Sequence, residues 1–355
     1  MTLAPSVDSF DAARLTHALR ADGTIGRDAS VREVRAEQIA MDSGFSSLLY
    51  RLHLAGDAGV PATVILKLPG EEAPAQAMHL LGGYARELAF YRDVAPHAPL
   101  GTPRVHVAEI DLDTSAFVLV LEDLKEWHNV DHLAGLTMEQ ALICIDRLAA
   151  LHAWSADRAN AARLGAFPSM DTPITRELFP LGYASAWQTY LTHARQPVPD
   201  GVARFSDSFP QCSSSALTAL TERQTLLLGD IRADNMFFAD GELKVVDFQF
   251  TALGAGATDV AYVVSQGLPT DLRTGRDREL LRTYLDALAR YGVTDYPFEQ
   301  AWRHYRIAVA YMLFLPVLAT AAWDTVPERA RDLCLTLVER SIAAIEEIGA
   351  LEEYA

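Results

Sequence analysis

The sequence predicts an α+β protein whose first part is built on a small antiparallel sheet and whose second part is mostly helical. Apolar residues alternate in strand fashion over residues 31–68 and again over 104–121, whereas helical periodicity dominates after Glu122. At 355 residues the chain is long for one hydrophobic core, which favours two lobes. We therefore expect one domain at residues 1–124 and a second at 125–355.

The first part begins with an amphipathic helix at residues 9–21, for which Ser9 or Asp11 is the N-cap. Three alternating runs then predict a strand meander, interrupted by turn residues at 42–44 and 56–57. The three runs are 31–40, 47–56 and 61–69. A helix and two further strands are predicted at 76–95, 104–110 and 115–121.

The second part carries the long helical patterns, with a short β region among them. The predicted helices include 137–155, 176–195, 277–291, 298–315 and 327–349. Three short apolar runs predict strands at Leu226–Leu228, Met236–Phe238 and Leu243–Val246, and Asp240-Gly241 predicts a tight turn between the last two. The apolar stretch Ile307–Ala322 contains a proline and is interpreted as a buried core helix, so no membrane span is expected.

Composition limits the classes of function. Hydrophobic residues make up 50% of the chain, which excludes a disordered protein. The 30 basic and 47 acidic residues give a net charge of −17, which argues against a nucleic-acid partner, since binding phosphates requires a basic face. The acidic balance is compatible with steering of a cationic substrate, and general solubility is the alternative explanation.

Cysteine usage predicts a reducing compartment. Cys144, Cys212 and Cys334 are far apart and odd in number, and they have no metal-binding spacing. Cys144 lies in an apolar helical stretch and is expected to be a small buried side chain. The first 15 residues have no basic region that leads into an apolar one, so we expect a cytoplasmic protein.

The segment LLLGDIRADNMFFADGELKVVDFQ, residues 226–249, carries the chemistry. Asp230 and Asn235 are five positions apart in a polar loop, and Asp247 follows the predicted hairpin. Carboxylate and amide oxygens are what Mg²⁺ takes when it also keeps phosphate oxygens and water. The spacing D-x-x-x-x-N followed by D-F-x is typical of phosphoryl transfer. The alternative is a solvated hairpin whose Asp and Asn residues only make turns.

This segment and the following G-A-G-A-T-D-V-A-Y, residues 254–262, resemble the aminoglycoside phosphotransferase and choline kinase group of small-molecule kinases. The resemblance is strongest to the ecdysteroid kinase-like branch and extends over about residues 40–315. It implies a two-lobed protein-kinase-like fold and ATP-dependent phosphorylation of a small molecule. Asp230 would act on the acceptor hydroxyl, while Asn235 and Asp247 would hold Mg²⁺.

The chain departs from the family at two positions in this region. Leu228 stands where the family usually has His before the Gly-Asp step, which affects the support of the catalytic loop more than its chemistry. Gln249 follows Asp247 and Phe248, and Gln is ordinary there in the family.

The resemblance also implies a nucleotide-binding pair in the first lobe. Lys67 lies in the apolar run T-V-I-L-K-L-P, where a lone charge needs an explanation. It would contact the nucleotide phosphates and pair with Glu87, twenty residues further on in the predicted helix. The alternative is a lysine on an edge strand with its ammonium group in water.

Two further nucleotide contacts are implied. The small residues Ser43, Gly44 and Ser46 would let the backbone approach phosphates, although a plain hairpin turn is equally compatible with them. The run F-V-L-V-L-E-D-L ends at a hinge, where the backbone from Glu122 to Leu124 would hydrogen-bond a purine.

Several polar residues are interpreted structurally. We favour Asp259 as the cap of the next helix over a role in the substrate cleft. Arg232 and Asp234 form either a structural ion pair or a phosphate contact. His128 and His132 are expected on a loop surface, with a place at the mouth of the cleft as the alternative. Aromatic residues near the C-terminus are expected mainly to pack, with a box for a quaternary ammonium as the alternative; they are Trp302, Tyr305, Tyr311, Phe314 and Trp323.

The sequence thus predicts a phosphotransferase that uses ATP and Mg²⁺ and acts on a small aminoglycoside-, choline- or steroid-like alcohol. A pseudokinase that binds nucleotide or another small ligand is the alternative, suggested by Leu228. A protein kinase is disfavoured because the chain has neither a G-x-G-x-x-G loop nor an A-P-E segment after Asp247. The acceptor, the choice between ATP and GTP, and the oligomeric state stay open.

Overall fold

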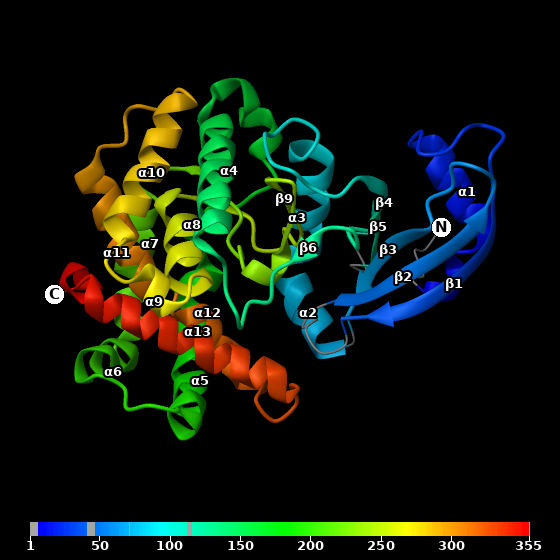
Figure 1. Ribbon diagram of the computed structural model, residues 1–355. Coiled ribbons are helices and arrows are strands. Elements are labelled where there is room, and N and C mark those ends of the chain that lie inside the picture. Colours follow the sequence, from blue (N-terminus) through cyan, green and yellow to red (C-terminus); the bar gives the residue numbers. More distant parts are fainter. Residues whose placement is uncertain (1–5, 41–46, 71, 112–115, 355) are drawn as a thin grey trace. The chain divides into compact units, whose positions relative to one another are not determined.

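The computed structural model describes residues 6–40, 47–70, 72–111 and 116–354. Its contacts divide the chain into two compact units, which we call the sheet unit and the helical unit (Figure 1). The sheet unit comprises residues 1–96, 102–127 and 246–249; the helical unit comprises 97–101, 128–245 and 250–355. The predicted α+β class, with its antiparallel sheet in the first part, is confirmed.

The sheet unit is built on five antiparallel strands in the order β1-β2-β3-β5-β4. Their bounds are Val31–Ile39, Ser47–Gly56, Thr63–Pro69, Val105–Ile110 and Phe117–Glu122 for β1 to β5. The predicted meander is therefore confirmed. Because β3 pairs with β2 on one side and β5 on the other, it is an internal strand of the sheet.

Helix α1, Ala12–Ala21, covers one face of this sheet (Figure 1). Its N-cap is Asp11, whose carboxylate accepts a hydrogen bond of 2.8 Å from the backbone N–H of Arg14. Leu15 and Leu19 are fully buried in a core shared with apolar residues of β2, β3 and β5. The amphipathic pattern of the sequence thus decides which face of α1 meets the sheet.

The single helix predicted over residues 76–95 is wrong. The chain forms α2 (Glu72–Leu80), α3 (Gly83–Ala89) and a π-helical turn at Phe90–Val94. Gly82 separates α2 from α3 with a φ of 69°, a left-handed conformation that glycine adopts readily. The break leaves α3 as a short helix of its own.

The helical unit contains most of the helices. They are α4 (Met138–Ala156), α5 (Phe179–His193), α6 (Asp200–Asp207), α7 (Phe209–Leu220), α8 (Ala257–Tyr262), α9 (Thr270–Arg273), α10 (Asp277–Arg290), α11 (Phe298–Tyr311), α12 (Phe314–Ala319) and α13 (Glu328–Glu347). Helix α4 begins at a capping box between Thr137 and Gln140 and packs against α10, while α11 packs against α8. Cys144 on α4 is buried, as predicted.

Short strands in the helical unit flank the loop that contains Asp230 and Asn235. They are β6 (His128–Asn129), β7 (Thr225–Leu227), β8 (Met236–Ala239), β9 (Glu242–Val245) and β10 (Ala252–Gly254). The predicted hairpin is confirmed: β8 pairs with β9, and its turn residues Asp240 and Gly241 have φ values of 50° and 78°. Strand β7 pairs instead with β10, on the far side of the hairpin in the sequence.

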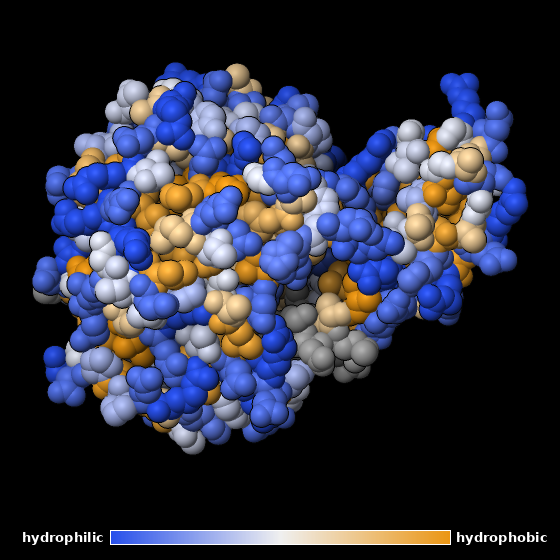
Figure 2. Space-filling view, in the orientation of Figure 1, coloured by the Kyte–Doolittle hydropathy of each residue, from blue (hydrophilic) through white to orange (hydrophobic). Residues whose placement is uncertain are grey.

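The apolar C-terminal stretch is mostly buried. Among the described residues, one segment, Phe298–Ala322, is long and apolar enough to cross a membrane, but 67% of its most apolar window lies inside the protein. It forms α11 and α12, in agreement with the predicted core helix. Figure 2 shows hydrophilic residues over most of the face in view.

Candidate active site

The first group of candidate residues surrounds Lys67 in the sheet unit. Lys67 lies in β3 with its side chain buried, and its Nζ is 2.8 Å from Glu87 Oε1 and 3.5 Å from Asp247 Oδ1. A buried ammonium is costly unless opposite charges and hydrogen bonds compensate it. The two carboxylates provide this compensation. The predicted ion pair between Lys67 and Glu87 is therefore present, and the edge-strand alternative is excluded because β3 is internal.

The charge of Lys67 is secured by these carboxylates. Burial alone lowers the pKa of Lys67, but the negative charges of Asp247 and Glu87 outweigh burial and raise it. The ammonium therefore stays protonated through the neutral pH range. A fixed, charged ammonium in a buried setting is suited to binding phosphate oxygens.

Asp247 is held in an unusual backbone conformation. Its φ is 66°, in the left-handed region that residues other than glycine adopt at a cost. The next residue, Phe248, stacks on Phe90 with ring centroids 3.6 Å apart and meets Tyr91 edge-on. Within the described part of the chain, Oδ1 of Asp247 is buried and has no hydrogen-bond partner apart from the Lys67 ammonium at 3.5 Å. A buried carboxylate oxygen of this kind fits the role of a cation ligand.

The second group lies in the helical unit, on the loop between β7 and β8. Asp230 Oδ1 accepts a hydrogen bond from the Tyr262 hydroxyl at 3.2 Å and lies 3.1 Å from Arg232 Nε. Burial raises the pKa of Tyr262 well above its ordinary value, so the hydroxyl is protonated and donates. One hydrogen bond and one ion pair on the same oxygen fix the orientation of the Asp230 carboxylate. The quoted motif at residues 254–262 ends at Tyr262, but its contact with Asp230, 32 residues away along the chain, has no local sequence signal.

Gly229 shapes the same loop. Its φ is 79°, and a Cβ atom at this position would lie 2.4 Å from the backbone oxygen of Phe250. Only glycine fits this close approach of two backbone segments. The Gly-Asp step of the motif therefore has a steric reason in this structure.

Asp259 holds the loop between β7 and β8, so its interpretation as a helix cap is wrong. Its carboxylate accepts hydrogen bonds from the backbone N–H groups of Leu228 at 2.7 Å and Gly229 at 3.1 Å. It lies inside α8, whose N-cap is Gly256. His152 of α4 contacts the same carboxylate at 3.3 Å. The loop is thus tied to α8 and α4 through one buried carboxylate.

Arg232 and Asp234 belong to a partly buried cluster of charges. Arg232 Nε is 3.8 Å from Asp234 Oδ1, and His132 Nδ1 is 3.4 Å from the same oxygen. Burial raises the pKa of Asp234, but the charge of Arg232 and the contact with His132 outweigh burial and hold the pKa well below its usual range. His132 is buried, so its expected place on the loop surface is wrong, whereas His128 is exposed.

Asn235 ends the loop at the short helical turn Ala233–Asn235. Its amide nitrogen donates a hydrogen bond of 3.0 Å to the backbone oxygen of Asp230. The amide oxygen is consequently the side-chain atom that can bind a metal. Within the described ranges, no group of three or more His, Cys, Asp or Glu residues could hold a metal ion. A metal bound by Asn235 or Asp247 would therefore take further ligands from phosphate and water, as Mg²⁺ does.

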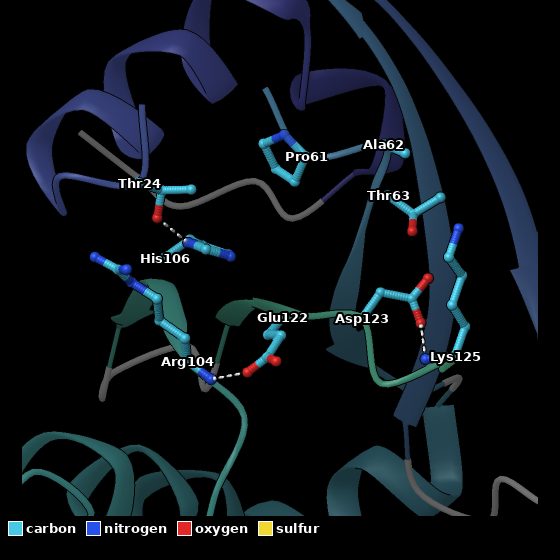
Figure 3. A pocket seen from close by; sticks show the side chains of 9 residues that line it. All are labelled: Thr24, Pro61, Ala62, Thr63, Arg104, His106, Glu122, Asp123 and Lys125. Carbon is cyan, nitrogen blue, oxygen red and sulfur yellow. Dashed lines mark hydrogen bonds between the residues drawn. The ribbon is translucent and has the colours of Figure 1, made fainter. Parts of the chain in front are cut away.

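The hinge segment borders a pocket of about 390 Å³ in the sheet unit (Figure 3). Glu122 lines this pocket, where its carboxylate accepts a hydrogen bond from the backbone N–H of Arg104 at 3.0 Å. The backbone N–H of Glu122 donates to the oxygen of Arg104 at 2.8 Å, and the oxygen of Leu124 accepts from Trp127 at 2.8 Å. Purine binding by the backbone at Glu122–Leu124 stays a prediction.

The remaining candidates divide into two sets. Ser43, Gly44 and Ser46 lie outside the described residues, so the phosphate loop also stays a prediction. Of the C-terminal aromatics, Trp302, Tyr305, Tyr311 and Phe314 are buried. Trp302 stacks on Tyr305 and Tyr311 lies against Phe314, which is ordinary packing between side chains of the unit.

Leu228 provides a first test of the loop. Its side chain is buried and its backbone N–H is held by Asp259, so the loop is anchored without a histidine at this position. We expect Leu228→His to change kcat by roughly tenfold or less, because residue 228 supports the loop but transfers no proton. Steady-state kinetics with the acceptor substrate measure this change. A much larger gain in kcat would identify Leu228 as the lesion of an inactive enzyme.

Comparisons with known proteins identify similar chains. The sequence profile of the ecdysteroid kinase-like family matches residues 42–293. A comparison with curated proteins finds no significant match. Solved structures with a similar fold include choline kinase from Cryptosporidium parvum Iowa II, which is 11% identical with a TM-score of 0.60 and covers 94% of this chain and 97% of its own.

Two further structures have the same fold. A choline/ethanolamine kinase family protein from Mesorhizobium loti is 17% identical, with a TM-score of 0.52 and coverage of 95% of this chain and 99% of its own. The aminoglycoside phosphotransferase APH(2″)-IIIa, solved with GDP and kanamycin, is 12% identical, with a TM-score of 0.53 and coverage of 94% and 99%. At identities this low, the structural similarity shows a shared fold. Function has to be argued from the site.

Proposed function

Because the chain belongs to the ecdysteroid kinase-like family, we propose that it is an ATP-dependent phosphotransferase that phosphorylates a hydroxyl group of a small molecule. The observation that carries the proposal is the buried Lys67, held between the carboxylates of Glu87 and Asp247. Two carboxylates around one internal ammonium are poorly explained by stability alone, since burying charges rarely gains free energy. They are well explained by a site that binds nucleotide phosphates.

We assign the nucleotide to residues 1–124 and the acceptor to residues 125–355. Lys67 would contact the α- and β-phosphates, with Glu87 keeping its ammonium in place. Ser43, Gly44 and Ser46 would approach the phosphates through their backbone, and the hinge at Glu122–Leu124 would bind the purine. A similar solved structure contains GDP, which supports the use of a nucleotide. That this nucleotide is ATP is our proposal.

Asp230 would act on the acceptor. Its carboxylate would accept the proton of the attacking hydroxyl and orient that hydroxyl toward the phosphate. Tyr262 and Arg232 fix the carboxylate in one orientation through Oδ1. Positioning of this kind contributes much of the catalysis in phosphoryl transfer, where little covalent chemistry falls to the protein.

Asn235 and Asp247 have the chemistry of Mg²⁺ ligands. The amide oxygen of Asn235 and the buried Oδ1 of Asp247 are both hard oxygen donors. Mg²⁺ bound by them would neutralise the charge that develops on the phosphate oxygens. The backbone oxygen of Asp230 orients the Asn235 amide, and the stacked Phe248 fixes the backbone of Asp247.

The acceptor is expected to be an alcohol of the aminoglycoside-, choline- or steroid-like classes. The similar structures are a choline kinase and a phosphotransferase solved with kanamycin, both named for cationic amines. The net charge of −17 favours a cationic acceptor within this range, because an acidic protein attracts cations. We propose a cytoplasmic enzyme, since its three cysteines are free. We expect no nucleic-acid or membrane partner, since its net charge is negative.

The direct test is ATP consumption against a library of small alcohols. We expect turnover of ATP in the presence of Mg²⁺ with at least one acceptor, and mass spectrometry should find a product heavier by one phosphoryl group. The variant Asp230→Asn is the matched control for contaminating kinases. Nucleotide binding without phosphorylated product from any compound would favour the pseudokinase alternative.

A further inference from the structure

Gln249 is buried beside the Lys67–Glu87 pair, and neither the family resemblance nor the proposed roles assign it a task. Its side chain is 1% exposed. Its amide nitrogen donates one hydrogen bond to Glu87 Oε2 at 3.1 Å and another to Ser47 Oγ at 3.1 Å. All of these residues belong to the sheet unit. Both protons of the amide group are therefore used on named acceptors.

The two oxygens of Glu87 have different partners. Oε1 faces the ammonium of Lys67 at 2.8 Å, while Oε2 faces the amide of Gln249. A carboxylate gripped at both oxygens has little freedom to rotate away from the lysine. Glu87 is fully buried, so loss of the amide would leave a charged oxygen without a donor, which is costly.

Three consecutive residues contact this pair and the turn that follows α3. Asp247 reaches Lys67, Phe248 stacks on Phe90 in the turn that follows α3, and Gln249 reaches Glu87 in α3. The segment of Asp247, the candidate metal ligand, is thereby fixed to Glu87, which orients Lys67. Ser47, at the start of β2, joins the strand to the same amide.

We propose that Gln249 is a positioning residue of the nucleotide site, which keeps Glu87 oriented on Lys67 and couples that pair to the Asp247 segment. The inference rests on the proposed function, because the ligand it positions for is the nucleotide phosphate group. The amide group can donate to both acceptors at once. A carboxylate at residue 249 would repel Glu87, and an apolar side chain would leave Oε2 unpaired.

The test is the isosteric substitution Gln249→Glu, with Gln38→Glu as the matched control. Gln38 is exposed on β1 of the same unit, so its substitution adds the same charge away from Glu87. We expect Gln249→Glu to weaken binding of Mg·ADP by at least ~10-fold, the size expected when a buried charge loses its donor and gains a like charge. Titration calorimetry measures the affinity, and Gln38→Glu should stay within about twofold of wild type.

A double-mutant cycle separates positioning from a general loss of structure. In Glu87→Gln/Gln249→Glu the amide and the carboxylate exchange places, so one donor again faces one acceptor. We expect the double variant to bind Mg·ADP at least ~5-fold better than the product of the two single losses predicts, which is the signature of directly coupled residues. In kinetics, Gln249→Glu should raise the KM for ATP and leave the KM for the acceptor unchanged.

Two outcomes would contradict the inference. Equal affinity of wild type and Gln249→Glu for Mg·ADP would show that Gln249 positions nothing, and the proposed function would be unaffected. Strictly multiplicative losses in the cycle would show that Gln249 and Glu87 act independently. Wild-type protein without measurable affinity for Mg·ADP would contradict the proposed function itself, which distinguishes the two failures.

Discussion

Asp230→Asn is expected to lower kcat by at least ~10²-fold, because general-base and orienting effects of a positioned carboxylate have about this size. Asparagine has the same shape and keeps an oxygen that can accept the hydrogen bond from Tyr262. The loop should therefore keep its conformation while losing the group that takes the proton. The KM for ATP should change much less, since Asp230 acts on the acceptor hydroxyl. Steady-state kinetics with saturating ATP and the acceptor measure both constants.

The control for this prediction is Asp286→Asn. Asp286 is exposed on α10 of the same unit, so the same loss of charge occurs away from the loop. We expect its kcat within about twofold of wild type, as for most surface substitutions. Near wild-type phosphoryl transfer by Asp230→Asn would show that another group carries out the proposed role.

Asp247→Ala is expected to abolish the Mg²⁺-dependent part of nucleotide binding, a loss of at least ~10²-fold in affinity when a charged metal ligand is removed. Calorimetric titration of ATP with and without Mg²⁺ measures this part directly. The substitution also has a conformational cost, because alanine at a φ of 66° is strained by about 1 kcal/mol or more. The alanine variant should unfold at a somewhat lower temperature, with its fold otherwise retained.

Asp247→Asn separates the charge from the strain. Asparagine tolerates the left-handed conformation, so this variant should keep wild-type stability and still lose Mg²⁺-dependent binding. Asp240→Asn is the matched control, since Asp240 also has a positive φ, of 50°, but lies exposed in the turn between β8 and β9. Unchanged Mg·ATP affinity in Asp247→Asn would make the metal assignment wrong.

The sequence by itself determined the local elements and the residues of the motif. Alternation of apolar residues predicted β1 to β5, and Asp240-Gly241 predicted the hairpin turn, because side-chain period and turn chemistry are properties of adjacent residues. The pairing of Lys67 with Glu87 was also predicted, because the family resemblance implies it and a lone charge in an apolar run needs an explanation.

Breaks and pairings within the elements were harder to predict. Helical periodicity continues through Gly82, so the division of residues 76–95 into α2, α3 and a π-helical turn was missed. A hydrophobic pattern shows which residues are apolar, but it does not show where the backbone leaves the helix. Strand β7 was likewise placed correctly, while its partner β10 follows the hairpin and has no local signal.

Only the tertiary structure decided what surrounds each motif residue. Asp259 is bound to the loop rather than capping α8, Tyr262 donates to Asp230, and Gln249 grips Glu87. These contacts join residues separated by 31, 32 and 162 positions. The order of residues along the chain does not specify these contacts. They follow from burial, because a polar group removed from water must bind a partner among the groups that packing brings near it.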